Sequence, residues 1–227
     1  MDDKIKNLYQ SLFEKFGVSP EAVKARDAKQ QYLRFKHLID LAEINQEDSV
    51  LDIGCGSGEL LTYLRKNNFN GQYCGIDFIP SFVDHANRVF ESDDKAKFIN
   101  KNIISDKFNE KFDWVILSGV FNDRRDDSET FFYNTIKKMY ETCTKGIVFN
   151  SLSKFVDYED DSLFYTYPDI TLKYCIENLS KYTVLNTNYQ LKENVIPFEY
   201  STCIFKKWNH FLLSKQECRQ IDFLEKF

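Results

Sequence analysis

A glycine-rich stretch at residues 49–64, SVLDIGCGSGELLTYL, has the residue types and spacing to bind a charged ligand. Apolar residues 50, 51 and 53 predict a buried strand, and residues 59–64 predict the start of a helix. Between them, Gly54, Gly56 and Gly58 let the backbone approach a ligand, and the N–H groups that open the helix add partial positive charge. The stretch predicts a nucleotide-binding loop. The alternative is a turn that needs glycines only for steric reasons and binds no ligand.

The residues around these glycines distinguish between ligands. The spacing of the glycines differs from the Gly-x-Gly-x-x-Gly of a dinucleotide fingerprint. The Gly-Lys-Ser/Thr of a phosphate-binding loop does not follow them either. Asp52 precedes the first glycine by two residues, and Glu59 follows the last one directly. Because two carboxylates repel a phosphate and attract a positive charge, they favour a cationic ligand.

A third acidic residue, Asp77, ends a second predicted strand within residues 72–78, which read QYCGIDF. An acid at the end of the second strand of a βαβ unit can accept hydrogen bonds from both hydroxyls of a ribose. We therefore expect Asp77, with its neighbour Phe78, at the same ligand. Asp77 could instead cap the next helix, where Pro80 reads as a first-turn residue, and both roles can coexist.

Composition limits the class of protein. A chain of 227 residues that is 43% hydrophobic can bury one sizeable core, most simply as a single α/β domain with additions. A net charge of −5 disfavours nucleic acid as a partner, because phosphate backbones require clustered Lys and Arg. The six cysteines are scattered, and we find no signal peptide, long apolar run or zinc-ligand cluster. We expect a cytoplasmic protein without a metal or a membrane partner.

Helical spacing covers most of the first 48 residues. Residues 2–16 predict one helix that Gly17 ends, and Ser19-Pro20-Glu21 predicts the start of a second helix that continues to residue 42. Its polar side, which includes Arg26, Gln30, Arg34 and His37, is either a solvated face or a cover that holds an anionic substrate group through Arg34. We divide the chain into a helical cover at 1–48, a core at 49–208 and a helical tail at 209–227.

Further polar residues follow the later predicted strands. Residues 97–103, 111–120, 145–152, 182–189 and 200–208 predict strands, and the last two should form an antiparallel hairpin because no helix separates them. Ser118 and Asn122 follow the fourth strand, beside the glycine loop if strand four neighbours strand one. Asn122 could instead cap the following helix.

An aromatic and acidic loop at residues 153–168 follows the fifth predicted strand and includes Asp157, Tyr158 and Tyr165. Aromatic rings stabilise a nearby sulfonium by cation–π contact, and carboxylates can hold an amine. The alternative is that the rings pack on the sheet while the acids face water.

The glycine loop and Asp77 resemble the S-adenosylmethionine (SAM) site of class I methyltransferases. Bacterial small-molecule methyltransferases of surface-polysaccharide pathways are similar at further motifs, namely Gln31-x-x-Arg34-Phe35, Ser118-Gly119-Val120-Phe121-Asn122, Val148-Phe149-Asn150, Asp157-Tyr158-Glu159-Asp160 and Leu163-Phe164-Tyr165. The resemblance implies a Rossmann-like α/β fold. Its seven-stranded, mostly parallel sheet would have the order 3-2-1-4-5-7-6, strand 7 antiparallel, and helices on both faces. SAM would be the cofactor and S-adenosylhomocysteine the product.

The resemblance also implies residue roles. Asn102 and Ile103 occupy the positions that contact adenine in class I methyltransferases, where Asp is usual in place of Asn102. Tyr9 is similar to a tyrosine in the N-terminal cover of phosphoethanolamine-type N-methyltransferases. Tyr9 and Tyr158 are our candidates for catalytic residues, and Gln31, Arg34, Asn122 and Tyr165 for substrate contacts.

We expect methyl transfer to a small soluble acceptor. The leading candidate is the amine of a phosphorylated amino alcohol in a surface-polysaccharide or capsule pathway. The alternatives are O-methylation of a sugar or sugar-derived acceptor and a catalytically silent SAM-binding subunit. The sequence is compatible with a monomer or a homodimer.

Overall fold

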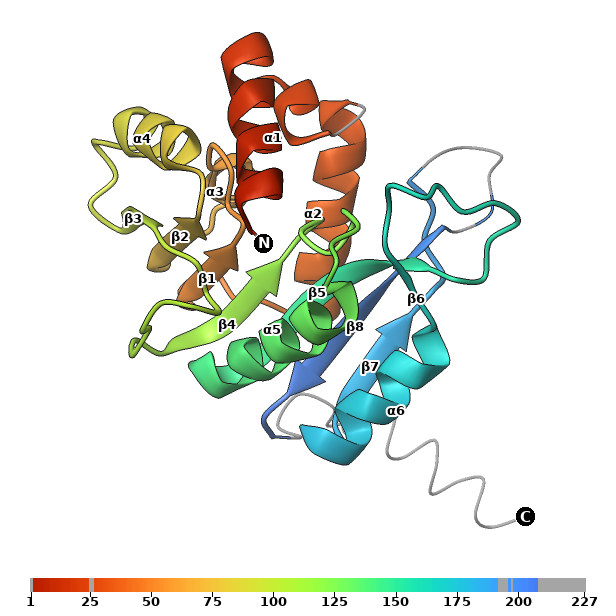
Figure 1. The fold of residues 1–227 in the computed structure, drawn as a ribbon. Helices are drawn as coiled ribbons and strands as arrows, with labels where there is room; N and C mark the ends of the chain where they lie inside the picture. The colour runs from red at the N-terminus through yellow and green to blue at the C-terminus, as the bar shows by residue number, and fades with distance from the viewer. Residues whose placement is uncertain (1, 25–26, 192–195, 197, 208–227) are drawn as a thin grey trace.

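The computed structural model describes residues 2–24, 27–191, 196 and 198–207 (Figure 1). Within these residues the chain forms one eight-stranded sheet, whose main path runs in the order β3-β2-β1-β4-β5-β8-β7. The strands are β1 (Val50–Ile53), β2 (Tyr73–Asp77), β3 (Ala96–Asn100), β4 (Phe112–Leu117), β5 (Cys143–Ser153), β6 (Tyr165–Thr166), β7 (Thr183–Asn186) and β8 (Glu199–Phe205).

The predicted Rossmann-like fold and strand order are confirmed. β8 pairs antiparallel with both β5 and β7, as expected of strands joined without a helix. The prediction missed β6, a two-residue strand in the expected loop 153–168 that pairs in parallel with the end of β5. A strand of this length has no readable alternation, so its sequence did not distinguish it from a loop.

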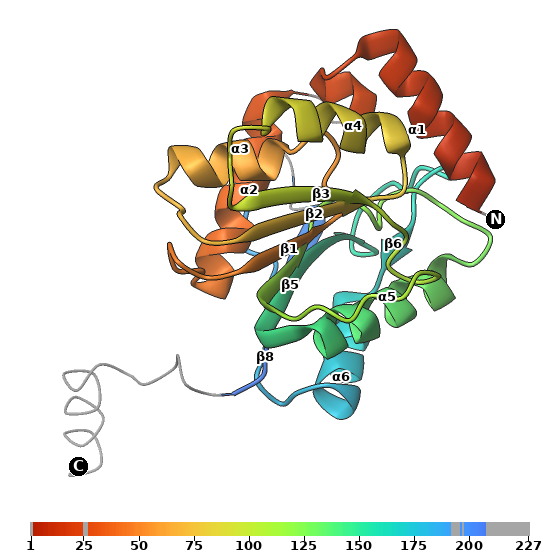
Figure 2. The same ribbon diagram turned by 90° about the vertical axis from the view of Figure 1, so that its left-hand side faces the viewer.

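Helices cover both faces of the sheet (Figures 1 and 2). Buried side chains of α2, α3 and α4 form one core cluster with alternate strand residues, and those of α5 and α6 form another. Within β1, Val50 belongs to the first cluster and Leu51 to the second. The period of two therefore turns Asp52 to the face of Val50. The helices are α1 (Asp2–Phe16), α2 (Ala28–Ala42), α3 (Glu59–Lys66), α4 (Pro80–Val89), α5 (Ser128–Thr142) and α6 (Pro168–Asn178).

The N-terminal cover differs from the prediction at its second helix. Residues Pro20–Val23 form only a short 3-10 helix, Lys24 has φ +55°, and α2 starts at Ala28. Asp27 caps α2, because its side chain accepts a hydrogen bond from the backbone N–H of Gln30 at 2.8 Å. The sequence Ser19-Pro20-Glu21 has the expected start signal, but the left-handed backbone at Lys24 cannot continue an α-helix.

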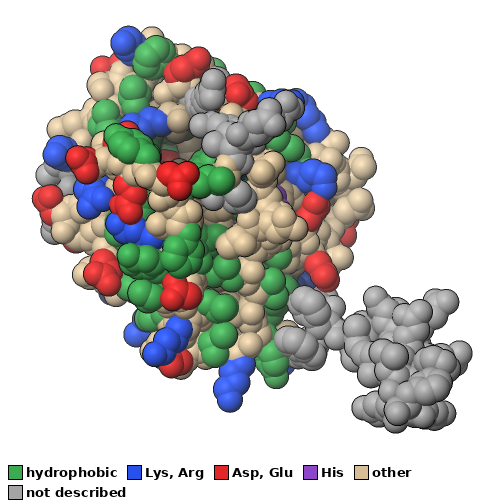
Figure 3. All heavy atoms as spheres, turned by 90° about the vertical axis from the view of Figure 1, so that its right-hand side faces the viewer, with side chains coloured by type: hydrophobic (Ala, Val, Ile, Leu, Met, Phe, Trp, Pro, Cys, Tyr) green, Lys and Arg blue, Asp and Glu red, His purple; other side chains and the backbone are tan. Residues whose placement is uncertain are grey.

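The predictions on the cysteines, the C-terminal tail and membrane spans have separate outcomes. Cys55, Cys74, Cys143, Cys175 and Cys203 are buried free thiols, whereas Cys218 and the predicted tail 209–227 lie outside the described residues. No described helix is both long and apolar enough to cross a membrane. Some large apolar side chains are exposed, including Phe155, Tyr167 and Ile170. Figure 3 shows hydrophobic side chains among the surface atoms of one side of the molecule.

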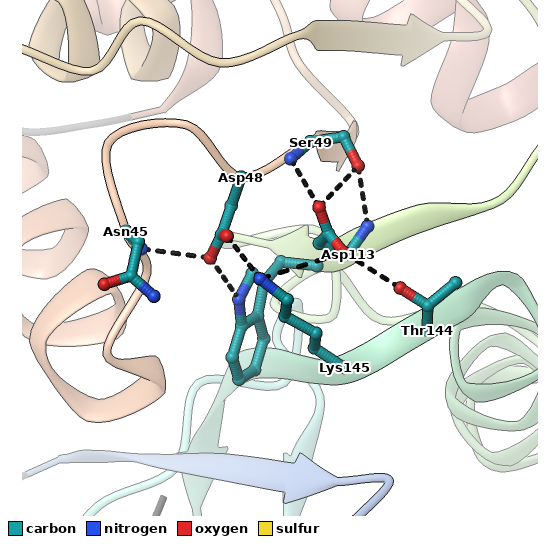
Figure 4. Close-up of polar contacts among 7 residues, drawn as sticks. Asn45, Asp48, Ser49, Asp113, Thr144 and Lys145 are labelled. Carbon is teal, nitrogen blue, oxygen red and sulfur yellow. Dashed lines mark hydrogen bonds and ion pairs between the residues drawn. The ribbon is translucent and has the colours of Figure 1, made fainter. Parts of the chain in front are cut away.

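A polar cluster joins the loop before β1 to the starting ends of β4 and β5 (Figure 4). The buried Asp48 carboxylate accepts hydrogen bonds from Trp114 Nε1 at 2.9 Å and from the Asn45 backbone N–H at 3.0 Å, and it pairs with Lys145. Next to it, Asp113 Oδ2 accepts the backbone N–H of Ser49 at 2.9 Å. These contacts fix where β1 begins, and hence where its far end delivers the glycine loop.

We expect Asp48→Ala to lower the free energy of unfolding by about 3 kcal/mol, because it leaves the Trp114 indole N–H buried without its acceptor and removes the Lys145 ion pair. Urea unfolding followed by circular dichroism measures this change. The matched control is Asp40→Ala, which removes an exposed pair with Lys36 whose side chains are both 60% exposed; it should cost less than about 0.5 kcal/mol. Equal losses in the two variants would contradict the prediction.

Candidate active site

A cavity of about 650 Å³ lies where the carboxyl ends of β1, β2 and β4 meet the N-terminal helices. Open α/β sheets bind ligands at this edge, next to the point where the strand order reverses. Apart from Gly58, every site residue predicted from the sequence lines the cavity. They are Tyr9, Gln31, Arg34, Asp52, Gly54, Gly56, Asp77, Phe78, Asn102, Ile103, Ser118, Asn122, Tyr158 and Tyr165.

The glycine loop passes close to the turn after β4. Gly54 has φ +73°, and a Cβ built there would lie 2.3 Å from Val120, so no larger residue fits. Gly58 has another role, because it lies at the N-cap of α3 with φ +91°, and a Cβ there would meet the Phe90 ring at 2.6 Å. Gly58 therefore packs α3 against its neighbours and does not line the cavity.

Asp77 holds the loop from the end of β2. Its Oδ2 accepts the backbone N–H of Gly56 at 3.0 Å, and its Oδ1 accepts that of Ile79 at 2.9 Å. The alternative that Asp77 caps α4 is wrong, since the N-cap is Ile79 and Pro80 opens the helix. Each carboxylate oxygen has a second lone pair, so Asp77 can still accept hydrogen bonds from a ligand.

Three carboxyl groups are buried together around the glycine loop. Burial raises the pKa of Asp52 to about 7, that of Glu59 to about 7 and that of Asp77 to about 6, and their mutual repulsion adds to the shifts of Asp52 and Glu59. Glu59 lines the cavity, although the sequence analysis singled out only its charge. Its position directly after the last glycine was the available signal.

Two of the four described basic side chains that line the cavity are paired with acidic residues of the same lining. Lys24 pairs with Asp123, and Arg34 binds Glu199 through two hydrogen bonds of 2.9 Å. The cluster of Asp52, Glu59 and Asp77 therefore has room for an external positive charge. A ligand with a sulfonium and an ammonium and without phosphate fits this donor set, whereas a dinucleotide or ATP does not. Among the described residues no group of His, Cys, Asp and Glu could hold a metal ion.

Asn102, predicted to contact adenine, lies in a turn after the end of β3. Ile103 is buried, and the Oδ1 of Asn102 accepts the backbone N–H of Ile104 at 2.9 Å. The same oxygen also accepts the backbone N–H of Ser105 at 3.5 Å, so the amide oxygen of Asn102 stabilises the local turn.

Tyr9 joins the helical cover to the core. Its hydroxyl donates to Asp123 Oδ2 at 2.5 Å, and burial, followed by the charge of Asp123, raises the pKa of this phenol well above its ordinary value. Tyr9 therefore stays protonated and cannot itself be the base, contrary to the role we expected. The adjoining carboxylate of Asp123, which the sequence analysis missed, also pairs with Lys24. It follows directly after Asn122, and this was the only signal.

Arg34 does not have the free charge expected of it. Its guanidinium is buried against Glu199, which also accepts the hydroxyl of Tyr189 at 2.7 Å. Burial would lower the pKa of Arg34, but the charge of Glu199 outweighs this effect and raises it. Arg34 lines the cavity mainly as part of a neutral pair between α2 and β8.

The remaining predicted residues differ in exposure. Tyr158 is 79% exposed at the cavity edge, whereas Tyr165 is 9% exposed and its hydroxyl accepts the backbone N–H of Asp160 at 3.2 Å. The side-chain oxygen of Asn122 is buried and has no hydrogen-bond partner in the structure. Asn122 is not a helix cap, because α5 begins after Asp127. Its orphaned oxygen therefore needs a donor, which a ligand can supply.

Comparisons with known proteins agree with this geometry. A family model described as a methyltransferase domain matches residues 44–157. A Mycobacterium tuberculosis relative named as a methyltransferase, Rv1506c, is 31% identical over 154 residues, which are 65% of this chain and 90% of the relative.

Solved structures share the fold. Magnesium protoporphyrin IX methyltransferase from Synechocystis PCC 6803, solved with bound S-adenosylhomocysteine, gives a TM-score of 0.62 at 12% identity over 91% of this chain and 96% of the other. The N-methyltransferase NodS from Bradyrhizobium japonicum WM9 gives 0.55 at 15% identity over 79% and 97%.

The sheet order, the glycine loop and the acidic cavity define a Rossmann-like transferase that takes a nucleoside carrying positive charge. The chain belongs to the class I SAM-dependent methyltransferase family. It is an enzyme whose cofactor is SAM.

We expect the affinity for SAM to increase from about pH 5.5 to about pH 8, since a bound cation favours the ionised forms of Asp52, Glu59 and Asp77. In the ligand-free protein, the free energy of unfolding changes with pH in the opposite direction. Folding raises these pKa values, so the stabilising contribution is complete at about pH 4 and is lost as the pH rises through about 6 to 7. The increase in Tm caused by SAM should therefore grow with pH.

Titration calorimetry in two buffers of different ionisation enthalpy measures the effect, because binding near pH 6.5 should release protons. An affinity that does not depend on pH, without proton release, would show that these carboxyl groups do not face the cofactor.

Proposed function

We propose that the protein transfers the methyl group of SAM to the amine of a small molecule. The observation that carries the proposal is a polar subsite in the cofactor cavity. There the Tyr9 hydroxyl binds Asp123 Oδ2 at 2.5 Å, and the buried oxygen of Asn122 lacks a donor. An amine supplies such a donor and also a proton that a carboxylate can accept.

The charge of the cavity supports an amine over an anionic acceptor. Its lining includes six acidic and four basic side chains, and two of the basic ones, Lys24 and Arg34, are paired with Asp123 and Glu199. A negative cavity attracts an ammonium compound from solution and concentrates it at the site.

Methyl transfer requires alignment and a free lone pair. SAM, when bound, supplies an activated methyl group, and the protein must align the acceptor nitrogen behind it and exclude water. An alkylammonium must first lose a proton, and Asp123 is placed to take it. Tyr9 orients this carboxylate by its hydrogen bond, and Asn122 Oδ1 can accept a second N–H of the acceptor.

We further propose that the lining residues of the glycine-loop half hold the cofactor, with Asp77 at the ribose and with Asp52 and Glu59 near the positive charges. Gly54, Gly56, Phe78, Asn102, Ile103 and Ser118 complete this half. The division into a cover at 1–48 and a core at 49–208 follows the same logic, because Tyr9 and Lys24 reach from the cover to Asp123.

A phosphorylated amino alcohol of a surface-polysaccharide pathway is the specific acceptor that the sequence resemblance suggests. Its amine suits the subsite of Tyr9, Asn122 and Asp123, while its phosphate would have to compete with Asp123 for Lys24 or with Glu199 for Arg34. The unphosphorylated amino alcohol avoids this competition, so the two forms should differ in KM.

The test incubates the purified protein with labelled SAM and a panel of amino alcohols, their phosphates, and sugars. Turnover of amines, with label on nitrogen, supports the proposal. Turnover of sugars alone would indicate an O-methyltransferase. Tight binding of SAM without turnover of any compound in the panel would contradict amine methylation and favour a catalytically silent subunit.

With an amine acceptor, we expect Asp123→Asn to reduce kcat about 100-fold at pH 7, because the amide cannot take a proton. The defect should shrink as the pH approaches the pKa of the acceptor, since more acceptor then arrives neutral. Asp40→Asn, at an exposed position on α2, is the matched control and should retain full activity. A wild-type kcat in Asp123→Asn, measured with saturating SAM, would remove Asp123 from the mechanism.

A further inference from the structure

Tyr73 reaches from β2 to the cavity-lining carboxylate of Asp52 on β1. Its hydroxyl donates to Asp52 Oδ2 at 2.5 Å, and the two residues are only 1% and 3% exposed. In the parallel register Val50 lies opposite Tyr73 and Asp52 opposite Gly75, so Tyr73 and Asp52 are diagonal neighbours on one face. Tyr73 does not line the cavity and has no place in the mechanism above.

The other titratable neighbours of Asp52 disfavour its charge. Asp77 at the end of β2 and Glu59 on α3 repel it, and Cys55 in the glycine loop is a buried thiol beside it. Of the described neighbours that act on Asp52, only Tyr73 lowers its pKa, because the hydrogen bond stabilises the ionised carboxylate. This one hydroxyl therefore opposes both burial and repulsion.

Core packing holds Tyr73 in position for its hydrogen bond to Asp52. Its ring belongs to the core cluster under α2, α3 and α4 and lies 5.6 Å from the ring of Phe98. Burial raises the pKa of the Tyr73 phenol well above its ordinary value, so the hydroxyl remains a donor at any working pH. Asp52 Oδ1 accepts no hydrogen bond from the described residues and is left for a ligand.

We propose that Tyr73 is a positioning residue for the cofactor. Its hydroxyl keeps Asp52 ionised and turns the free oxygen of that carboxylate toward the positive charge of SAM. Tyr73 thereby determines how far the pH can fall before the cofactor is lost. This inference rests on the proposed cofactor site and is independent of the methyl acceptor.

The test measures the affinity for SAM by calorimetry from about pH 5.5 to about pH 9 in wild type and in Tyr73→Phe, which keeps the ring and removes the hydroxyl. Loss of a hydrogen bond to a charged group should weaken binding about tenfold at pH 7. Because Asp52 then ionises at higher pH, the affinity should return to the wild-type value near the upper end of the range.

Tyr200→Phe is the matched control. Tyr200 is also fully buried and donates or accepts hydrogen bonds with Thr166 and Thr171, but it lies outside the cavity. It should lower stability without moving the pH profile of SAM binding. A loss of affinity in Tyr73→Phe that is equal at every pH, or no loss, would overturn the proposal.

Asp52→Asn separates this inference from the cofactor site itself. If Asp52 faces SAM, Asp52→Asn weakens binding at high pH, and adding Tyr73→Phe then causes no further pH shift. Unchanged affinity in Asp52→Asn would overturn both the placement of Asp52 and the role of Tyr73. A wild-type profile in Tyr73→Phe, with weakened binding in Asp52→Asn, would overturn the role of Tyr73 alone.

Discussion

Burial of three carboxyl groups at one edge of the sheet is the constraint on which the site depends. Asp52, Glu59 and Asp77 are shielded from water, and the cations across the cavity are committed to Asp123 and Glu199. Burying a charged carboxylate without a partner costs free energy. A positively charged ligand in the cavity therefore stabilises these carboxylates. In the cofactor site that we propose, the sulfonium and ammonium of SAM provide this charge, and nucleotides that contain phosphate would be repelled.

The rest of the fold brings these groups together and keeps water out. Parallel strands β1 and β2 end at the same edge, so Asp77 can bind the backbone of the loop that follows β1. At the opposite edge, the cluster around Asp48 joins the start of β1 to β4 and β5. Tyr9 and Lys24 then attach the helical cover to Asp123. The three buried carboxyl groups and the pairs at Asp123 and Glu199 therefore line one cavity.

Two tyrosine–carboxylate pairs hold polar groups of the cavity in place. The hydroxyls of Tyr73 and Tyr9 each donate to a carboxylate, Asp52 on the cofactor side and Asp123 on the acceptor side. Since a phenol with a raised pKa remains a donor, each tyrosine stabilises the charge of its partner. At Asp52, the hydrogen bond from Tyr73 opposes the effect of burial, which raises the pKa of that carboxyl to about 7.

The sequence by itself predicted the main strands and the ligand-binding loop, because these follow from local periodicity, glycine spacing and the acids beside the glycines, whereas the fold and the strand order came from the resemblance of the loop and Asp77 to class I methyltransferases. Every site residue predicted from the sequence, apart from Gly58, lines the cavity. Only the tertiary structure decided which charges are paired. Arg34 meets Glu199 and Tyr9 meets Asp123 across more than a hundred residues of chain, and the break at Lys24 and the two-residue β6 depend on packing. Contacts between distant segments leave no periodic signal, so they could not be predicted from spacing.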